Sequence, residues 1–282
     1  MLKIDCILDR FSFDCFAPEV SLRPLAIGSK PSKDADLLFV ESAWDSVNGG
    51  WYLGTDKHRE ELEMLLRECR KKGIPTVFWG KEDPVQVERF KWITPQFDYV
   101  CTTASETIKR HTEILGHDRI AVLPFAAQPD IHYSSPSTSR ENVPCFAGAY
   151  YDDQFAERQR EVEYVIKPAT AFGLHLYDRG LAGNFYKNHQ TFPKEYTEYL
   201  KPAVPYEKMG QIYRSYDVFL NIGCVTKSPT MFSRRVFEVL ASGTPLISAY
   251  SVGIEHLLGD VVHLSKSASD TKGFLKTLLK DK

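Results

Sequence analysis

The stretch SPTMFSRRVFEVLASGTPLIS, residues 228–248, carries the pattern that decides the fold class. Apolar side chains within residues 236–241 give a helix one apolar side, and Gly243 followed by Pro245 is a typical helix ending. Residues 246–247 then begin a short apolar strand. A helix, a tight glycine turn and a buried strand in this order form half of a βαβ unit, so the stretch predicts an α/β fold with a parallel sheet.

The same alternation of strand and helix patterns runs through the rest of the chain. Such patterns follow one another at residues 36–42, 58–73, 74–84, 97–106, 106–116 and 120–129, and again from residue 145 onward. A polar, turn-rich stretch at residues 132–144 interrupts them and is the best candidate for a linker. We therefore expect two Rossmann-like domains, residues 1–137 and 138–282, with parallel sheets that face a central cleft.

Length and composition restrict the class of protein. The net charge of −2, from 35 basic and 37 acidic side chains in 282 residues, provides no overall field that would recruit nucleic acid. The six cysteines form no CxxC pair and have no histidine at metal-ligand spacing, which argues against a structural zinc. Acidic residues interrupt the N-terminal apolar run, and no later run approaches the ~20 apolar residues of a membrane span. We therefore expect a cytoplasmic protein, with its oligomeric state open.

The second half of the chain resembles the nucleotide-sugar-binding domain of GT-B glycosyltransferases. The resemblance rests on an ordered set of motifs from residue 143 to about residue 258: VPCFAGAYY, LHLYDRG, VPYEKMGQIYRSYDVFLN, FSRRVFEVLASGTPLIS and VGIEHLL. KEDP, LPFAAQP and SPTMFSRRVFE are similar more narrowly to the spore-maturation-protein-like subgroup, which extends the likeness over most of the chain. The resemblance implies the GT-B fold and a nucleotide diphosphate sugar, such as a UDP-sugar, as donor.

Within this resemblance, Glu238 stands where a helix glutamate accepts hydrogen bonds from both ribose hydroxyls. Arg234 and Arg235 lie near the start of the same helix, where a planar, permanently charged guanidinium suits the oxygens of a diphosphate. Consecutive helical residues point about 100 degrees apart. We therefore expect at least one arginine on the diphosphate, while the other packs or pairs with an acid.

One position departs from the family pattern. Many retaining GT-B enzymes carry a second glutamate eight residues before the ribose-binding one, and here that position is Thr230. The stereochemical outcome of transfer therefore stays open. The backbone amides of Thr230, Met231 and Phe232 are candidates to line the phosphates at the helix start, whereas Met231 and Phe232 have an alternative interpretation as core residues.

Further candidates for donor binding lie elsewhere in the second half. Gly148 follows a predicted strand, where a missing side chain lets the backbone approach a diphosphate or simply makes a turn. Arg158 and Arg179 are possible phosphate partners or members of ion pairs. Tyr206 is placed to stack on a base or to cap a helix with its ring.

The candidate catalytic residues lie in the first half. FWGKEDP leaves a predicted strand and delivers Lys81, Glu82 and Asp83 to the edge of the sheet, and Glu41 ends another strand at LLFVES. An acid at this edge would orient or deprotonate an acceptor hydroxyl. The alternative is a simple turn in which Asp83 caps the next helix.

Together these features imply a hexosyltransferase of the Leloir type, which moves a sugar from a nucleotide diphosphate donor to a hydroxyl acceptor on a glycan or glycoconjugate. No cofactor and no metal are expected, because arginines would take the place of the metal; Asp152 and Asp153 form the nearest acidic pair. A nucleotide-sugar epimerase of the same fold and a non-catalytic nucleotide-sugar-binding protein are the alternatives. The lack of G-x-G-x-x-G after a predicted strand and of a Walker A motif disfavours dehydrogenases and P-loop enzymes.

Overall fold

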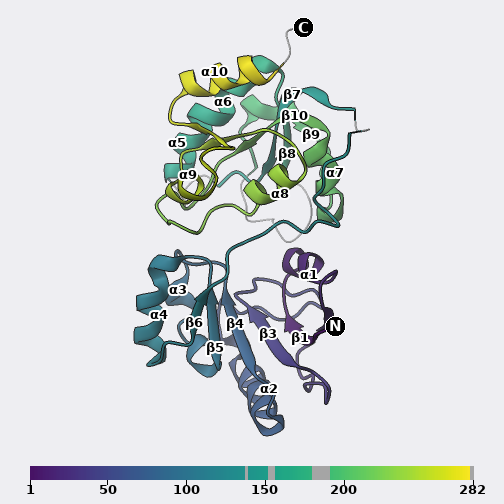
Figure 1. The fold of residues 1–282 in the computed structure, drawn as a ribbon, viewed down its shortest axis with the longest axis vertical. Helices are drawn as coiled ribbons and strands as arrows, with labels where there is room; N and C mark the ends of the chain where they lie inside the picture. The colour runs from purple at the N-terminus through teal and green to yellow at the C-terminus, as the bar shows by residue number, and fades with distance from the viewer. Residues whose placement is uncertain (137–138, 152–155, 180–190, 280–282) are drawn as a thin grey trace. The chain divides into compact units, whose positions relative to one another are not determined.

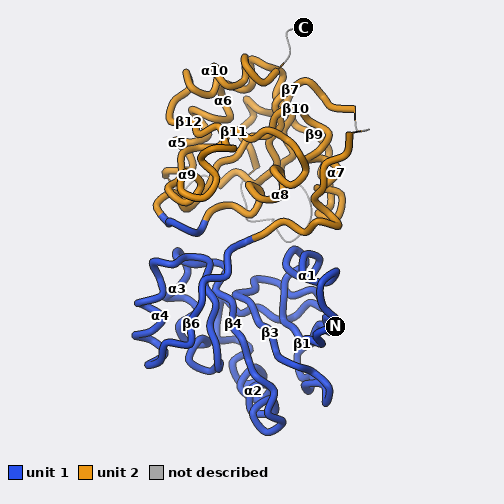
Figure 2. The backbone as a smooth tube through the Cα atoms, viewed as in Figure 1, with its two compact units in different colours: residues 1–125, 228–231 blue, residues 126–227, 232–282 orange. Residues whose placement is uncertain are grey.

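The computed structural model describes residues 1–136, 139–151, 156–179 and 191–279 (Figure 1). The chain forms two compact units, which Figure 2 shows in separate colours: the first unit contains residues 1–125 and 228–231, and the second unit contains residues 126–227 and 232–282. Each unit is built around one parallel sheet.

The sheet of the first unit has six parallel strands in the order β2-β1-β3-β4-β5-β6. They are β1 (Lys3–Ile7), β2 (Ser21–Pro24), β3 (Leu37–Glu41), β4 (Thr76–Gly80), β5 (Tyr99–Thr102) and β6 (Ile120–Val122). Strand β1 pairs with β2 on one side and with β3 on the other, so the strand order reverses beside β1. Ligands of such sheets bind beyond the carboxyl ends of the strands at the point of reversal, which makes the ends of β1 and β3 a candidate site.

The helices of the first unit are α1 (Arg10–Phe16), α2 (Arg59–Lys72), α3 (Val87–Phe90) and α4 (Ile108–Leu115). Helix α2 buries Leu62, Leu65 and Leu66 in the core of the unit. Full burial of a leucine side chain stabilises a protein by about 1.5–3 kcal/mol, so this amphipathic segment gains most of its stability from packing. It ends at Gly73, whose φ of 67° is the left-handed conformation typical of a helix ending.

The sheet of the second unit also has six parallel strands, in the order β12-β11-β10-β7-β8-β9. They are β7 (Glu141–Gly148), β8 (His175–Asp178), β9 (Leu200–Lys201), β10 (Tyr216–Asn221), β11 (Leu246–Ala249) and β12 (His263–Ser265). Here the order reverses between β7 and β10. The ends of these two strands, Gly148 and Asn221, therefore mark the corresponding candidate site of the second unit.

The helices of the second unit connect these strands. They are α5 (Ala156–Glu161), α6 (Lys167–Ala169), α7 (Met209–Arg214), α8 (Arg235–Ala241), α9 (Val252–Leu258) and α10 (Ala268–Leu278), with a π-helical turn η4 (Val162–Ile166) between α5 and α6. Helix α8 and strand β11 are the elements predicted from residues 228–248. Gly243 between them has a φ of 72°, which suits the predicted glycine turn.

The predicted fold class is confirmed, because both sheets are parallel and alternate with helices. The expected linker at residues 132–144 is wrong in part, since residues 141–144 begin β7. The compact units part between Phe125 and Ala126, and the domain boundary at residue 137 stays a prediction. Within the described ranges, every helix is too short or too polar to cross a bilayer.

A short segment, residues 228–231, belongs to the first unit although its neighbours on both sides belong to the second. The Thr230 hydroxyl donates to the carbonyl oxygen of Thr103 at 2.8 Å and accepts from the amide of Ser105 at 2.9 Å. The Ser228 hydroxyl donates to the carboxylate of Glu106 at 2.9 Å. The chain therefore passes between the units three times.

Candidate functional site

Arg235 lies at the point of reversal of the second sheet. Its guanidinium donates to Asn221 Oδ1 at 2.9 Å and lies 5.1 Å from the centre of the Phe146 ring. A Cβ atom on Gly148 would lie 2.9 Å from Arg235 Nη2 and 2.8 Å from the Phe146 ring. The missing side chain of Gly148 thus makes room for Arg235 and Phe146. The sequence had instead suggested that Gly148 lets the backbone approach a diphosphate or makes a turn.

Two more arginines lie close enough to Arg235 to influence its charge. Arg158 is buried and donates to the carbonyl oxygens of Ala149 at 2.8 Å and Ile222 at 3.0 Å. Arg179 follows β8 and donates to the Tyr151 hydroxyl at 3.0 Å. Burial, followed by the charges of Arg158 and Arg179, lowers the pKa of Arg235 to about 10, so its side chain stays protonated at neutral pH. Three guanidinium groups thus gather at this edge of the sheet, an arrangement that suits an anion.

Glu238 lies one turn further along α8 and is almost completely enclosed, with 2% of its side chain exposed. Its Oε1 accepts from the Tyr206 hydroxyl at 2.8 Å and from Arg234 Nε at 3.0 Å. Its Oε2 accepts from the Tyr213 hydroxyl at 2.9 Å. His132 Nε2 lies 3.9 Å from Oε1. The structure therefore brings together three residues that the sequence singled out, Arg234, Tyr206 and Glu238, and adds Tyr213 and His132.

The two adjacent arginines have different neighbours, as their angular separation on a helix requires. The guanidinium of Arg234 lies 5.2 Å from the centre of the Tyr206 ring and pairs with Glu238. Arg235 instead contacts Asn221 and Phe146. Of the pair, Arg235 is the arginine that lies at the positive edge of the sheet.

The backbone amides of residues 230–232, which were expected to line the phosphates at the helix start, do not lie at that start, and their role on phosphates stays a prediction. Helix α8 begins at Arg235, and the amides of Thr230 and Met231 donate to the Ser228 hydroxyl at 3.4 and 3.0 Å. Phe232 is a buried core residue whose ring stacks on Phe237 at 5.0 Å. The core interpretation of Phe232 is therefore the right one. The hydroxyl of Thr230 is occupied within the first unit.

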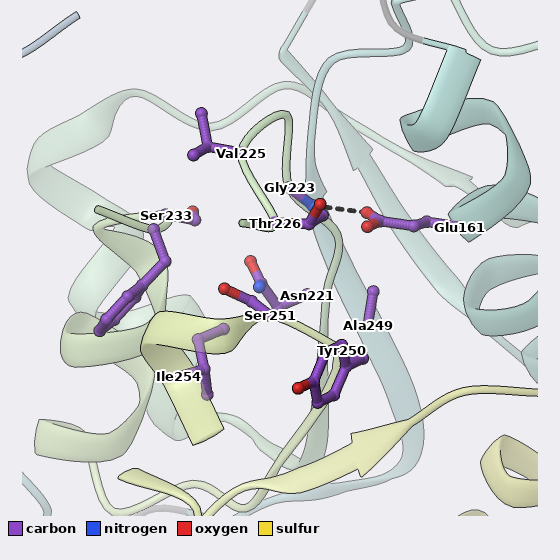
Figure 3. A pocket seen from close by; sticks show the side chains of 11 residues that line it. Glu161, Asn221, Gly223, Val225, Thr226, Ser233, Ala249, Tyr250, Ser251 and Ile254 are labelled. Atoms are coloured by element: carbon purple, nitrogen blue, oxygen red, sulfur yellow. Dashed lines mark hydrogen bonds between the residues drawn. The ribbon is translucent and has the colours of Figure 1, made fainter. Parts of the chain in front are cut away.

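A small pocket lies beside this region in the second unit, at the carboxyl ends of β10 and β11 (Figure 3). Asn221, Thr226 and Ser251 line it together with Glu161, whose Oε2 accepts from the amide of Gly223 at 2.7 Å. Burial raises the pKa of Glu161 to about 7. The pocket does not include Arg234, Tyr206 or Glu238, because Glu238 is covered by its own partners.

A second cluster lies at the point of reversal of the first sheet. Lys81, directly after β4, pairs with Glu41 at the end of β3 at 2.9 Å and with Asp9 after β1. Glu41 Oε1 also accepts from the Asp9 amide at 2.5 Å. Asp9 caps α1 through the Ser12 amide at 2.8 Å. We call Asp9, Glu41 and Lys81 the acid–lysine cluster.

Burial controls the charges of the acid–lysine cluster. Glu41 is fully buried, and this burial, with the nearby Asp9 carboxylate, raises the pKa of Glu41 to about 7. Burial alone would lower the pKa of Lys81, but the carboxylates of Asp9 and Glu41 raise it above its usual value. Asp9 keeps 21% of its side chain exposed, so it is the member of the cluster that reaches solvent.

Asp83 lies elsewhere, which corrects the prediction that KEDP delivers its charges together. Its Oδ2 accepts from the Thr102 hydroxyl at 2.7 Å and lies 2.7 Å from His111 Nε2, and all three side chains are buried. Asp83 does not cap a helix either, since α3 has its cap at Gln86 without a side-chain bond. Glu82 is half-buried, and its amide donates to the Ser42 hydroxyl at 3.2 Å.

The predicted acidic pair Asp152 and Asp153 lies outside the described residues. Among the residues that are described, no three His, Cys, Asp or Glu side chains converge as metal ligands would.

The sequence interpretation missed Asp9, which lies two residues after the end of β1, although it identified Glu41 at the end of β3. Asp5 interrupts the apolar pattern of β1 and hid that strand, yet Asp5 is buried because it pairs with Arg23 at 2.7 Å. Tyr213 was also missed, and its position seven residues after Tyr206 was the available signal, since that spacing brings two residues to the same side of a helix.

Residues 158–282 match a family described as glycosyl transferase-like. No curated protein matches the sequence.

Several solved structures have a similar fold. HepE of Anabaena in complex with UDP has a TM-score of 0.56 at 10% identity, and the match covers 98% of this chain and 89% of that chain. BGT of phage T4 in complex with UDP and Mn²⁺ has a TM-score of 0.56 at 11% identity, with the same coverage of 98% and 89%. A UDP-N-acetylglucosamine 2-epimerase of Rickettsia bellii has a TM-score of 0.50 at 12% identity, covering 100% and 88%. The chain thus has a GT-B-like α/β fold, which it shares with these structures, and its residues 158–282 match the glycosyl transferase-like family model.

Proposed function

We propose that this protein is a Leloir-type hexosyltransferase that moves a sugar from a nucleotide diphosphate donor, with UDP as the nucleotide, to a hydroxyl acceptor. The observation that carries the proposal is the positive edge of the second sheet. Arg235, Arg158 and Arg179 lie there next to a helix carboxylate, Glu238. UDP is the nucleotide present in the structures of HepE and BGT. We also propose that the protein belongs to the spore-maturation-protein-like subgroup of glycosyltransferases.

In this proposal the arginines bind the diphosphate and stabilise its charge as it departs. A nucleoside diphosphate leaves with about two negative charges, and preorganised cations aimed at developing charge are a principal means of catalysis. Arg235 is already held by Asn221, so little reorganisation is needed when the charge appears. Because arginine supplies the positive charge, we propose that transfer needs no metal ion.

The acceptor is assigned to the first unit. The acid–lysine cluster offers Asp9, the exposed member, as the base that receives the proton of the acceptor hydroxyl. Lys81 and the buried Glu41 act as positioning residues for Asp9. The net charge of the cluster is negative when both acids are ionised, which favours a neutral polyol such as a glycan over an anionic acceptor.

The test measures binding of UDP and of uridine to the whole chain by isothermal titration. Arg235→Ala should lose at least tenfold in affinity for UDP and little for uridine, because only UDP carries the diphosphate. Glu238→Gln should lower the affinity for both UDP and uridine, because both ligands carry the ribose. Arg160→Ala is the matched control, since its side chain is 73% exposed and pairs with Glu157.

The outcomes separate the assignments. Equal losses for UDP and uridine in Arg235→Ala would show packing damage and remove the diphosphate role. Unchanged affinity in a folded Glu238→Gln variant would remove the ribose role. Detection of UDP release with a glycosylated product would then establish transfer.

The alternative with specific support is a nucleotide-sugar epimerase. It is favoured by the similarity to the epimerase of Rickettsia bellii over the whole of this chain, at a TM-score of 0.50. The products decide between the two, because an epimerase returns an isomeric sugar and a transferase extends an acceptor. A protein that binds UDP and does neither would be a non-catalytic binding protein.

A further inference from the structure

Glu238 is fully engaged in the structure, although the proposed function requires it to accept the ribose hydroxyls. Its Oε1 accepts from Tyr206 and Arg234, its Oε2 accepts from Tyr213, and 2% of its side chain is exposed. A ribose cannot reach such a carboxylate while every partner stays in place. One of the donors must leave when a nucleotide binds.

The two tyrosines differ in how easily they can leave. Tyr213 is a core residue of α7 with 4% exposure, and its ring packs edge-on against Phe219 at 5.2 Å. Tyr206 is half-buried and begins η9 (Tyr206–Lys208), a single 3₁₀ turn. Removing Tyr213 would open the core, whereas Tyr206 packs only at the margin of that core, so displacing its ring leaves the core intact.

The side chain of Arg234 favours the same choice. Its guanidinium lies 5.2 Å from the centre of the Tyr206 ring and pairs with Glu238. When the Tyr206 ring moves away, Arg234 can still hold the carboxylate. A buried carboxylate therefore keeps a cation as partner throughout the exchange, which lowers the cost of opening.

His132 provides a second donor on the same carboxylate. Its Nδ1 accepts from the Gln128 amide at 3.1 Å, which assigns the ring proton to Nε2. Nε2 is buried, lies 3.9 Å from Glu238 Oε1 and has no hydrogen-bond partner among the described residues. A small shift of Glu238 would bring this N–H within bonding distance once Tyr206 has left.

From these contacts we infer that Tyr206 is a gate on the ribose site: its hydroxyl occupies, on Glu238 Oε1, the place of a ribose hydroxyl. Binding of a ribonucleoside diphosphate exchanges one hydroxyl donor for another, while Tyr213 and Arg234 hold the carboxylate in position. The inference rests on the proposed function, since it assumes that Glu238 binds ribose. It also defines specificity, because only a ligand that brings a sugar hydroxyl to Glu238 replaces the bond that is lost.

The test compares two Tyr→Phe variants, which delete one hydroxyl each from the same carboxylate. Tyr206→Phe should bind UDP about three- to tenfold more tightly than the wild type, because no hydroxyl has to be displaced. Tyr213→Phe should not gain affinity for UDP, because Tyr213 holds Glu238 in both the free and the bound state, and it is therefore the matched control. Affinities come from isothermal titration, and folding is checked by circular dichroism.

The results that overturn the gate are distinct from those that overturn the function. Equal or weaker UDP binding by folded Tyr206→Phe, with the wild type binding UDP, removes the gate and leaves the function in place. No binding of any nucleoside diphosphate by the wild type or by Tyr206→Phe removes both. A measurement on the wild type tests the ribose contact itself: 2′,3′-dideoxy-UDP, which has neither ribose hydroxyl, should bind about tenfold more weakly than UDP, and equal binding removes the ribose role and the gate with it.

Discussion

Glu161 is an acid whose burial has a measurable consequence for stability. It is 3% exposed and accepts from the amide of Gly223, and burial raises its pKa from 4.5 to about 7 (Figure 3). Between these two values the folded protein holds a proton that the unfolded chain has released. The free energy of unfolding therefore decreases as pH rises from 4.5 through about 7.

Replacement of Glu161 by glutamine should remove this dependence, because the amide stays neutral and its oxygen can still accept from Gly223. We expect Glu161→Gln to be more stable than the wild type at pH 8 by on the order of 1–3 kcal/mol, with the difference vanishing at low pH. Urea denaturation between pH 4 and pH 8.5 measures it. Glu163→Gln is the control, since Glu163 is 60% exposed and pairs with Lys167. A difference that grows towards low pH would contradict the assignment.

The candidate residues show what sequence can provide at this scale. The roles of Arg234, Arg235 and Glu238 were predicted through the resemblance to GT-B donor domains. Tyr206 was predicted as a ring that stacks on a base or caps a helix, and its hydroxyl bond to Glu238 was not foreseen. Tyr213 was missed, because which hydroxyl faces Glu238 depends on how η9 and α7 lie against α8. Contacts between elements that are distant in sequence are set by tertiary packing, and local patterns carry little information about them.

The loop after β4 is the element whose interpretation changes most. Asp83 accepts from Thr102 of β5 and contacts His111 of α4, so it ties three elements of the first unit together. A Cβ on Gly80 would lie 2.6 Å from Asp83 Oδ2, which shows how closely this side chain packs on the strand end. The hydrophilic sequence KEDP suggested a loop whose charges lie together at the edge of the sheet, whereas the Asp83 side chain is buried.

Asp83→Asn should accordingly destabilise the first unit while leaving the second unit intact. Both contacts of the carboxylate are made by Oδ2, so an amide oxygen in its place accepts them only as a neutral, weaker acceptor, and hydrogen bonds to charged groups contribute about 1.5–3 kcal/mol against about 0.5–1.5 kcal/mol for neutral ones. Denaturation should show a lower free energy of unfolding, and titration should show an unchanged affinity for UDP. Glu82→Gln, at a half-buried position, serves as the control and should leave stability unchanged. Unchanged stability in Asp83→Asn, together with reduced turnover, would return Asp83 to the catalytic residues.

At the scale of the whole molecule, the proposal that arginines replace a metal ion can be tested directly. Sugar transfer should persist in excess EDTA, because the donor charge is met by side chains of the protein. Release of UDP from a UDP-sugar in the presence of acceptor measures turnover with and without the chelator. Loss of turnover in EDTA, restored by Mn²⁺ or Mg²⁺, would contradict the proposal. Asp152 and Asp153 would then be the first residues to replace.

The segment at residues 228–231 limits how this protein can be divided. The chain leaves the first unit after Phe125 and returns for four residues, where the Thr230 hydroxyl fills the space between Thr103 and Ser105. A fragment that ends at Phe125 would lack Thr230, so the carbonyl of Thr103 and the amide of Ser105 would lose their partner. The complementary fragment would contain residues 228–231 without the residues of the first unit to which they bond. Neither unit is therefore encoded by one continuous stretch of sequence, so exchanging the two units between related chains requires residues 228–231 to be chosen to match the first unit rather than the second.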